Sequence, residues 1–294
     1  MAPQKKALFI INPKAGPQRG VDVSALIDNQ LKDSLLSYRI QFTERAGHAI
    51  DLATQAIEEG YNVVAAVGGD GTVNETAQAL INSETALGIV PFGSGNGLAR
   101  DLDIPLDAAK AVDLIQQLQV TTIDSATANG RPFFCTAGVG FDAYISKQFA
   151  KQPERGFKTY LKNTLLEFAR YQSGVYTVRA EGFNMEYKAF SITFANARQF
   201  GNNAFISPLA DIKDGQLDLC IVKDYPKHLG INLGLRLFNK SIHKSSYVEI
   251  MKITQATVTC PVGSFYHLDG EAFDLEKDTL AIKIKPASLK VVTP

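Results

Sequence analysis

Short apolar runs alternate with helical patterns along roughly the first 125 residues. Five of these runs have the length and composition of strands, and the first, third and fourth are apolar enough to be buried on both faces. The runs are ALFIIN (7–12), YRIQFT (38–43), NVVAAVGG (62–69), ALGIVPFG (86–93) and VTTIDSAT (120–127). The segments between them repeat apolar residues at helical spacing, over 21–36, 46–60, 72–83 and 106–119. This alternation predicts a parallel sheet with helices on its faces.

The pattern changes after about residue 126, where apolar and polar residues begin to alternate with the period of two that is typical of half-buried strands. The segment TANGRPFFCTAGVG (127–140) contains Asn-Gly, a strong hairpin signal. Two helical patterns, roughly 144–172 and 226–243, interrupt the strands. We therefore predict an α/β protein with a Rossmann-like parallel-sheet domain over 1–125 and a mostly antiparallel β domain over 126–294, whose last residues can return to the first domain.

Composition and charge narrow the function classes. The 294 residues include 30 Lys and Arg and 30 Asp and Glu, so no net charge attracts the chain to nucleic acid. Three cysteines, with no CxxC spacing, argue against a disulfide framework or a zinc site. No apolar run approaches the length of a membrane span, and the N-terminus lacks the pattern of a signal peptide. We expect a cytoplasmic protein without a transmembrane segment.

Four loops at the strand ends are rich in glycine and small polar residues. They are NPKAG (12–16), TERAGHA (43–49), GGDGTVNE (68–75) and PFGSGNGLAR (91–100). Ligands of open α/β sheets bind at the carboxyl ends of the strands, so we expect the four loops to converge. Backbone N–H groups and helix N-termini bind phosphates, and glycine lets a phosphate come close. One such loop alone would be explained as a turn, but four together favour a nucleotide.

Asp70 adds a carboxylate to the third loop. A carboxylate beside phosphates needs a cation, and Mg²⁺ suits this position because it binds one or two carboxylates together with phosphate oxygens and water. The alternative is that Asp70 caps the following helix, where Thr72 would serve equally well.

Four motifs together resemble the catalytic family of diacylglycerol kinases and sphingosine kinases: NPKAG, GGDGTVNE, PFGSGNGLAR and HLDGE (267–271). The resemblance covers nearly the whole chain. It implies an NAD kinase/diacylglycerol kinase-like fold with the active site in a cleft between two domains, and ATP-dependent phosphorylation of a lipid hydroxyl. GGDGT alone is shared with NAD kinases, so an NAD kinase-like enzyme is the alternative, and a catalytically inactive lipid-binding homologue is a third reading.

The resemblance also assigns roles to residues. Those that it places at ATP are Asn12, Pro13, Lys14, Ala15, Gly16, Thr43, Gly68, Gly69, Asp70, Gly71, Thr72, Val73, Asn74, Ser94, Gly95 and Asn96. Asp70 and Asp124 would join the network of the catalytic Mg²⁺. Asp269 with Glu271 would supply the acid/base function, although Asp70 is the base proposed for sphingosine kinases. Taken alone, HLDGE could instead be an ordinary hairpin turn.

Two further features of the family can be compared with this chain. Bacterial diacylglycerol kinases carry an aspartate where Gly97 stands here, whereas sphingosine kinases have a small residue, so the substrate branch stays open. ADIKDGQLDL (210–219) resembles a structural magnesium loop, with the Asp211 carbonyl, the Asp214 side chain and the Gln216 carbonyl as ligands. The alternative there is an Asp-Gly turn that leads into a strand.

The lipid substrate implies peripheral contact with a membrane, on its inner face in a cytoplasmic protein. Residues 225–246 set a leucine stripe against basic residues, a pattern that fits either an interfacial helix or a helix that buries one stripe on its own sheet. The stripe consists of Leu229, Leu233 and Leu237. Residues 151–170 are similarly basic and apolar, the four histidines are scattered enough to be surface or capping residues, and a homodimer stays open.

Overall fold

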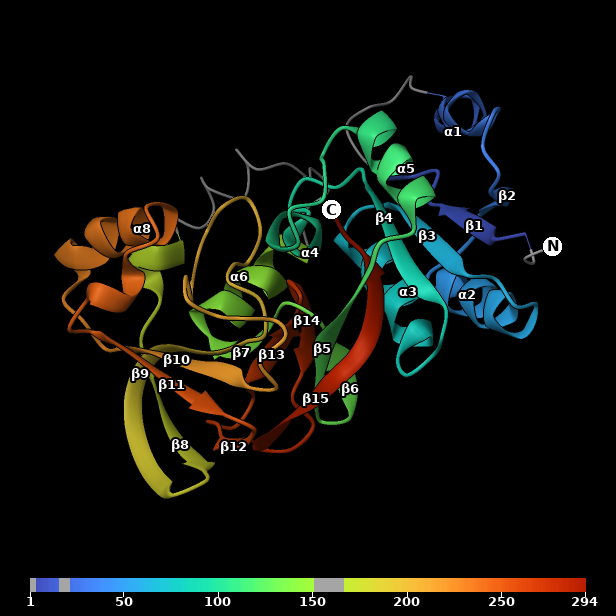
Figure 1. The fold of residues 1–294 in the computed structure, drawn as a ribbon. Helices are drawn as coiled ribbons and strands as arrows, with labels where there is room; N and C mark the ends of the chain where they lie inside the picture. The colour runs from blue at the N-terminus through green and yellow to red at the C-terminus, as the bar shows by residue number, and fades with distance from the viewer. Residues whose placement is uncertain (1–3, 16–21, 151–166) are drawn as a thin grey trace. The chain divides into compact units, whose positions relative to one another are not determined.

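The computed structural model describes residues 4–15, 22–150 and 167–294. The chain forms two compact units (Figure 1). Unit 1 consists of Met1–Ile123 with Ala287–Pro294, and unit 2 of Asp124–Pro286. The α/β class, with a parallel sheet followed by antiparallel strands, is confirmed.

Unit 1 is built on a parallel sheet in the order β4-β3-β1-β2. Its strands are β1 (Lys6–Ile11), β2 (Ser37–Phe42), β3 (Val63–Gly68) and β4 (Ala86–Pro91). Every residue of β3 and β4 is buried, as expected for strands covered on both faces. The predicted strand at 120–127 does not pair directly with any of these four strands: β5 (Val120–Ala128) pairs with β6 and β15 instead. The end of β15 (Thr279–Val292) runs parallel to β4, with Val291 opposite Leu87.

Helices cover both faces of this sheet, with α1 and α5 on one face and α2 and α3 on the other (Figure 1). Their bounds are α1 (Val23–Leu31), α2 (His48–Glu58), α3 (Asp70–Leu80), α4 (Gly97–Asp101) and α5 (Ala108–Gln117). Asp22 and Asp107 cap α1 and α5, each through a side-chain oxygen that accepts a backbone N–H of the first turn. Helix α1 ends five residues earlier than predicted, and Leu35 beyond it is 90% exposed.

Unit 2 is mostly antiparallel. Its strands besides β5 and β15 are β6 (Arg131–Phe133), β7 (Thr136–Gly140), β8 (Gly174–Ala180), β9 (Phe183–Ala195), β10 (Leu217–Lys223), β11 (Val248–Ile253), β12 (Gln255–Thr259), β13 (Phe265–Leu268) and β14 (Glu271–Asp274). The predicted Asn-Gly hairpin is confirmed, because Asn129 and Gly130 join β5 to β6 and both have positive φ.

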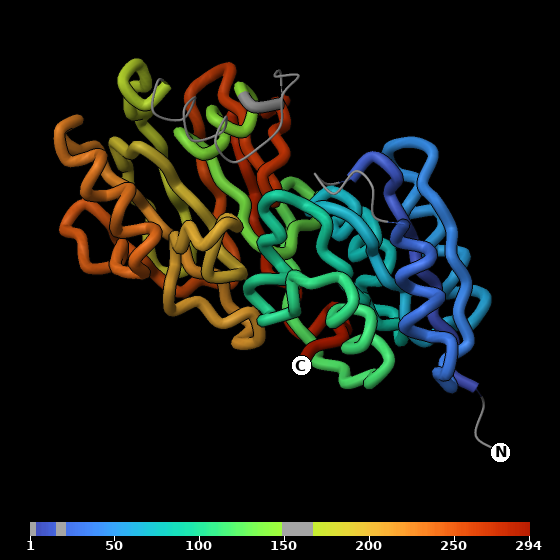
Figure 2. Tube along the Cα trace, turned by 90° about the horizontal axis from the view of Figure 1, so that it is seen from above, coloured from blue at the N-terminus to red at the C-terminus, as the bar shows by residue number. Residues whose placement is uncertain are grey.

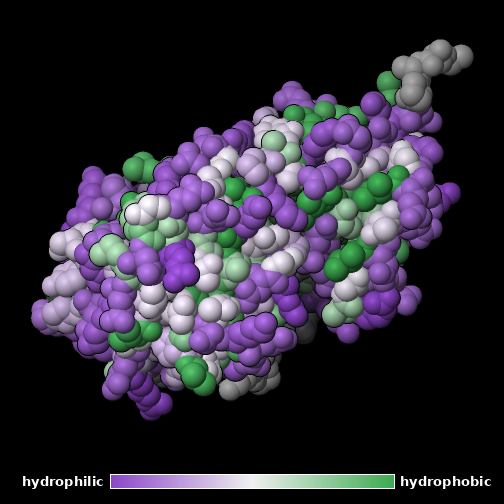
Figure 3. All heavy atoms as spheres, turned by 90° about the horizontal axis from the view of Figure 1, so that it is seen from below, coloured by the Kyte–Doolittle hydropathy of each residue, from purple (hydrophilic) through white to green (hydrophobic). Residues whose placement is uncertain are grey.

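The described helical segments of unit 2 are α6 (Phe141–Ala150), residues 167–170, the short 3₁₀ helices Lys227–Leu229 and Ile242–Lys244, and α8 (Gly230–Phe238). Helix α6 covers the start of the predicted 144–172 pattern, of which 151–166 lie outside the described residues. Within the described ranges, no helix is both long and apolar enough to cross a membrane. The face drawn in Figure 3 is mostly hydrophilic, with hydrophobic residues in small groups between polar ones.

The C-terminus belongs to unit 1, where the chain end lies beside the green and cyan segments (Figure 2). Hydrogen bonds hold it there: the Asn82 N–H donates to the Ser288 carbonyl, and the Thr293 N–H donates to the Gln119 carbonyl. Lys290 also pairs with Glu84 at 2.6 Å. Residues 287–294 are therefore part of the first unit, although they are the last in the sequence.

Candidate functional site

The glycine-rich loops of unit 1 meet at the carboxyl edge of the parallel sheet. The loop after β1 contacts helix α3 through Asn12, whose Nδ2 donates to Thr72 Oγ1 at 3.1 Å. The loop after β2 is held to the same helix by Glu75, whose carboxylate accepts the N–H groups of Gly47 at 2.9 Å and Ala49 at 3.3 Å. The predicted convergence of the loops is thus a set of direct hydrogen bonds to α3.

Asp70 joins the third loop to the fourth. Its Oδ2 accepts the Asn96 N–H at 2.9 Å and its Oδ1 accepts the Gly97 N–H at 2.7 Å. Asp70 therefore supplies acceptors at the start of α4, while it lies itself in the first turn of α3, where a negative charge is favourable. An ionised carboxylate offers about four lone-pair sites, so two sites remain for a cation.

The glycines of these loops serve different purposes. A Cβ on Gly69 would lie 3.3 Å from the Gly93 backbone, and one on Gly95 would lie 2.8 Å from Oδ2 of Asp70. These glycines let the third and fourth loops pack against each other, a reason that the sequence analysis did not identify. At Gly71, in contrast, an added Cβ would meet nothing within 4 Å. The open space above the first turn of α3 is where a phosphate can approach.

The other residues that the resemblance places at ATP differ in exposure. Lys14 and Ser94 are exposed, whereas Thr43 is half-buried and donates its N–H to the end of β1. Val73 is buried in the core of unit 1. Gly16 lies outside the described residues. The exposed members are the ones that a ligand can reach directly.

In unit 2, HLDGE forms the turn between β13 and β14. Leu268 pairs with Glu271, and the two residues between them, Asp269 and Gly270, have φ values of 48° and 87°. Two consecutive residues with positive φ are the geometry of a tight hairpin turn. The motif is therefore a hairpin turn, whatever further role its carboxylates have.

The two carboxylates of the turn have very different surroundings. Asp269 accepts three backbone N–H groups: its Oδ2 that of Phe134 at 2.9 Å, and its Oδ1 those of Cys135 at 2.8 Å and Thr136 at 3.0 Å. The Glu271 side chain is exposed and makes no hydrogen bond or ion pair with any residue that the structure describes. Asp269 is thus held in place, while the Glu271 carboxylate keeps its acceptor sites.

His267 is not the surface or capping residue that the sequence analysis expected. It is 1% exposed, and its Nε2 lies 3.3 Å from Oδ2 of Asp142, which also accepts the Thr193 hydroxyl at 2.7 Å. A Cβ on Gly138 would lie 2.7 Å from that same carboxylate oxygen, so glycine is needed for this close packing. Its neighbours Tyr266 and Leu268 are buried as well, so β13 has no alternation of exposed and buried residues that could have marked His267 as an inward position. His48 does not cap α2 either: its Nδ1 accepts the N–H of Glu44, in the loop before the helix, at 3.1 Å.

Asp124 and the 211–216 loop lie together in unit 2. Asp124 is 2% exposed, and its Oδ2 accepts the Gly215 N–H at 2.7 Å. Its own N–H donates to the Ile212 carbonyl at 2.8 Å. The structure therefore links Asp124 to the loop that resembles a structural magnesium site.

The Asp214 carboxylate in this loop already forms an ion pair with a lysine. Lys252 Nζ lies 2.5 Å from the Asp214 carboxylate and 3.0 Å from that of the buried Asp218. Burial alone would lower the pKa of Lys252, but its hydrogen bonds to the two carboxylates outweigh that effect and raise it. The Asp211 carbonyl is engaged within a turn, where it accepts the Asp214 N–H at 3.3 Å.

Magnesium can be tested against these donors. In the described part of the chain, no three His, Cys, Asp or Glu side chains converge as a metal cage. Mg²⁺ needs none, because it binds through one or two carboxylates and completes its shell with phosphates and water. The donors at Asp70 and in the 211–216 loop are hard oxygens, so their chemistry fits Mg²⁺.

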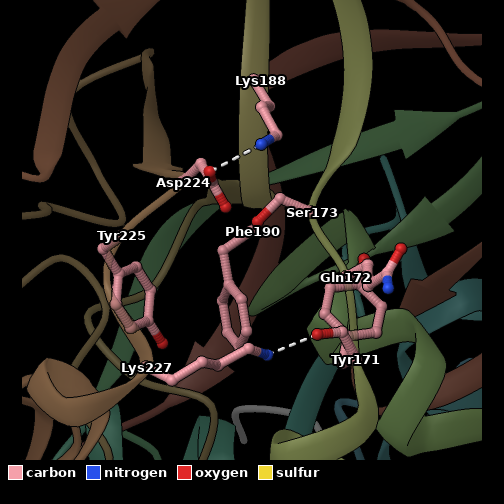
Figure 4. Close-up of a pocket in the computed structure, with 8 residues that line it drawn as sticks. All are labelled: Tyr171, Gln172, Ser173, Lys188, Phe190, Asp224, Tyr225 and Lys227. Carbon is pink, nitrogen blue, oxygen red and sulfur yellow. Dashed lines mark hydrogen bonds and ion pairs between the residues drawn. The ribbon is translucent and has the colours of Figure 1, made fainter.

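Unit 2 also contains a small aromatic pocket of about 190 Å³ (Figure 4). Its lining residues are Tyr171, Gln172, Ser173, Lys188, Phe190, Asp224, Tyr225 and Lys227. The Phe190 ring packs between Tyr171 and Tyr225, with centroids 5.3 and 5.1 Å away. Burial raises the pKa of both tyrosines, so both remain neutral.

Comparisons with known proteins cover both units. A model of the diacylglycerol kinase catalytic domain matches residues 6–128, and a model of the YegS C-terminal NAD kinase beta sandwich-like domain matches residues 135–293. A Pseudomonas aeruginosa protein named "Probable lipid kinase YegS-like" is 30% identical over 98% of this chain and 94% of its own length. One of the same name from Klebsiella pneumoniae is 29% identical over 98% of this chain and 96% of its own.

A solved structure described as a diacylglycerol kinase from Bacillus anthracis has the same fold. It superposes with a TM-score of 0.78 over 99% of this chain and 97% of its own, at 21% identity. The two domain matches follow the order of the motifs along the chain. The protein therefore belongs to the diacylglycerol kinase family, in the group with a YegS-type C-terminal domain, and is a kinase.

Proposed function

We propose that this kinase transfers the γ-phosphoryl group of ATP to the hydroxyl group of a lipid, with Mg²⁺ as cofactor. The observation that supports ATP as the phosphoryl donor is the geometry of the N-terminus of α3. No side chain caps this helix, and the space above Gly71 is open. Helix N-termini bind phosphates through free N–H groups and the helix dipole.

Asp70 would hold the cofactor in this arrangement. Its two hydrogen bonds to the fourth loop fix the carboxylate beside the helix N-terminus and leave lone pairs for Mg²⁺. When bound, Mg²⁺ neutralises charge on the phosphates. The loops supply the remaining contribution, which is alignment of the triphosphate by backbone N–H groups.

On the acceptor side, we assign the base to Glu271 and a positioning role to Asp269. A general base must reach the hydroxyl proton with an unoccupied lone pair. The exposed Glu271 carboxylate has unoccupied lone pairs to offer, whereas both oxygens of Asp269 are engaged by N–H groups. Proton removal from the lipid hydroxyl by Glu271 makes the oxygen a better nucleophile towards the γ-phosphorus.

The experiment that tests the proposal offers labelled ATP and Mg²⁺ to the protein with different acceptors in parallel. The acceptors are diacylglycerol, sphingosine, ceramide, phosphatidylglycerol and NAD. A labelled lipid product that depends on Mg²⁺ is the expected result. Label on NAD alone would favour the NAD kinase-like alternative, and no transfer to any acceptor would favour an inactive lipid-binding protein.

The different surroundings of Gly71 and Gly95 allow a test with a matched pair of variants. Gly71→Val adds atoms in open space, so Tm should stay within about 2 °C of the wild type while the KM for ATP rises about ten-fold or more. Gly95→Val places its Cβ against the Asp70 carboxylate, so Tm should fall as well. Calorimetry and ATP titrations measure both effects. An unchanged KM in Gly71→Val would remove the N-terminus of α3 from the phosphate site.

The 211–216 loop gives a second pair. Asp214→Ala should lower Tm by about 2–4 °C, because it removes a partner of Lys252, and should abolish any rise in Tm caused by added Mg²⁺. Asp211→Ala keeps the backbone carbonyl that would bind the ion, so its Mg²⁺ response should persist. The same Mg²⁺ response in both variants would rule out Asp214 as a ligand.

A further inference from the structure

Helix α8 has two apolar faces, and the structure buries only one. Leu233 is 6% exposed and packs with Cys220 and Val222, and Leu237 is packed against the same cluster. This confirms the self-packing alternative for the leucine stripe that the sequence analysis identified. The second face is solvent-exposed. It consists of Ile231 (74% exposed), Leu235 (60%) and Phe238 (45%), and we call it the outer face of α8.

These three residues form one continuous stripe, because positions separated by four and then three residues lie above one another on a helix. Gly234 borders the stripe and has nothing within 4 Å of an added Cβ, so described residues do not cover that side. A single exposed hydrophobic residue such as Leu35 needs no explanation. Three exposed hydrophobic side chains aligned along one face of a helix, in contrast, mark an interaction surface.

The charge around the outer face indicates its partner. No acidic residue occurs between Asp224 and Glu249, whereas this segment contains four lysine and arginine residues. Lys240 and Lys244 are exposed beyond the end of α8. Lys227 precedes the helix and is held by the Phe168 and Tyr171 carbonyls, so it contributes charge but not a mobile side chain.

We propose that the outer face of α8 docks onto an anionic lipid bilayer. A short apolar stripe in a segment that contains cations and no acidic residue matches an interfacial helix, which inserts its apolar side chains at the level of the headgroups. Membrane docking is a property separate from phosphoryl transfer. It depends on the proposed function only because the purpose of docking is to bring the protein to a lipid substrate.

The chain contains no tryptophan, so one introduced tryptophan reports on its own surroundings. Leu235→Trp should shift its fluorescence emission to the blue when vesicles of phosphatidylglycerol and phosphatidylcholine are added. It should not shift with phosphatidylcholine alone, and the shift should weaken in about 0.5 M salt, which screens the lysines. Val262→Trp, at a position that is 97% exposed on the β12–β13 loop, is the control and should not shift. No shift at residue 235, or equal shifts at both positions, would overturn the proposal.

A second measurement is sedimentation with the same vesicles, without nucleotide. The triple variant Ile231→Ser, Leu235→Ser, Phe238→Ser should lose about ten-fold or more in vesicle affinity at unchanged Tm, because all three side chains are exposed. The pair Leu35→Ser, Val262→Ser should bind like the wild type. Wild-type vesicle binding by the triple variant would overturn the proposal.

Two further readouts separate the other outcomes. Phosphorylation of a lipid in detergent micelles should survive in the triple variant, so loss of vesicle binding with retained micelle activity distinguishes docking from the proposed reaction. If the wild type is instead a dimer that the triple variant dissociates, and vesicles bind neither, the outer face belongs to a second copy of the chain and the membrane proposal is wrong.

Discussion

Replacing Glu271 with glutamine should lower kcat for phosphoryl transfer by about 10²–10⁴-fold, the usual contribution of a general base. Glutamine keeps the size of the side chain and loses only the ability to accept the proton. Because Glu271 is exposed and has no partner among the described residues, Tm and the KM for ATP should stay unchanged. Steady-state kinetics on the lipid product, together with calorimetry, measure both quantities.

Glu276→Gln is the matched control, since it neutralises another exposed glutamate shortly after β14. It should leave kcat within about two-fold of the wild type. Full activity in Glu271→Gln would transfer the base role to another carboxylate, with Asp70 the next to be changed.

Replacing Asp269 with asparagine should damage stability as well as rate. Asparagine tolerates the positive φ of the turn, so the backbone can be retained. However, its NH₂ group must face at least one of the three N–H donors that the carboxylate now accepts. A buried donor without an acceptor costs about 1–3 kcal/mol, which corresponds to a Tm lower by about 3–10 °C in a protein of this size. The rate should fall too, because the turn carries Glu271.

The comparison for this variant is Asp274→Asn, which loses only a surface ion pair with Lys147 and should cost about 0–1 kcal/mol. A stable Asp269→Asn protein with a large loss in kcat and no change in Tm would show that Asp269 acts on the substrate itself. That result would contradict the positioning role.

The sequence predicts much of the fold because its strongest signals are local. Strands β3 and β4 are continuous apolar runs, and the Asn129–Gly130 turn is set by two residues that accept positive φ. The choice of partner for each strand depends less on the local sequence. The alternating run 249–260 has the pattern of a single strand, but it breaks at Thr254 into β11, which pairs with β10, and β12, which pairs with β8 and β15. Such partner choice depends on residues far away in the chain.

The candidate site shows the same division. Convergence of the loops follows from the parallel sheet, so it could be predicted. The reason for Gly95 could not, because it depends on where the Asp70 carboxylate lies after folding. For the same reason, the sequence singles out the stripe that contains Leu233, and only the tertiary packing shows that this stripe is inside and that Leu235 is outside.

The return of residues 287–294 to unit 1 has a consequence for biosynthesis. Strand β4 has β3 on one side, but its other side lacks a strand neighbour until residue 291 has been made, because Val291 is the residue that pairs with Leu87. Until then β4, which is apolar throughout, is an exposed edge strand of the kind that templates aggregation. Completion of the unit 1 sheet on the ribosome therefore waits until residues 287–292, which follow unit 2 in the chain, have been made. A fragment that stops at residue 128 would contain the whole catalytic-domain match yet lack the segment that protects its sheet.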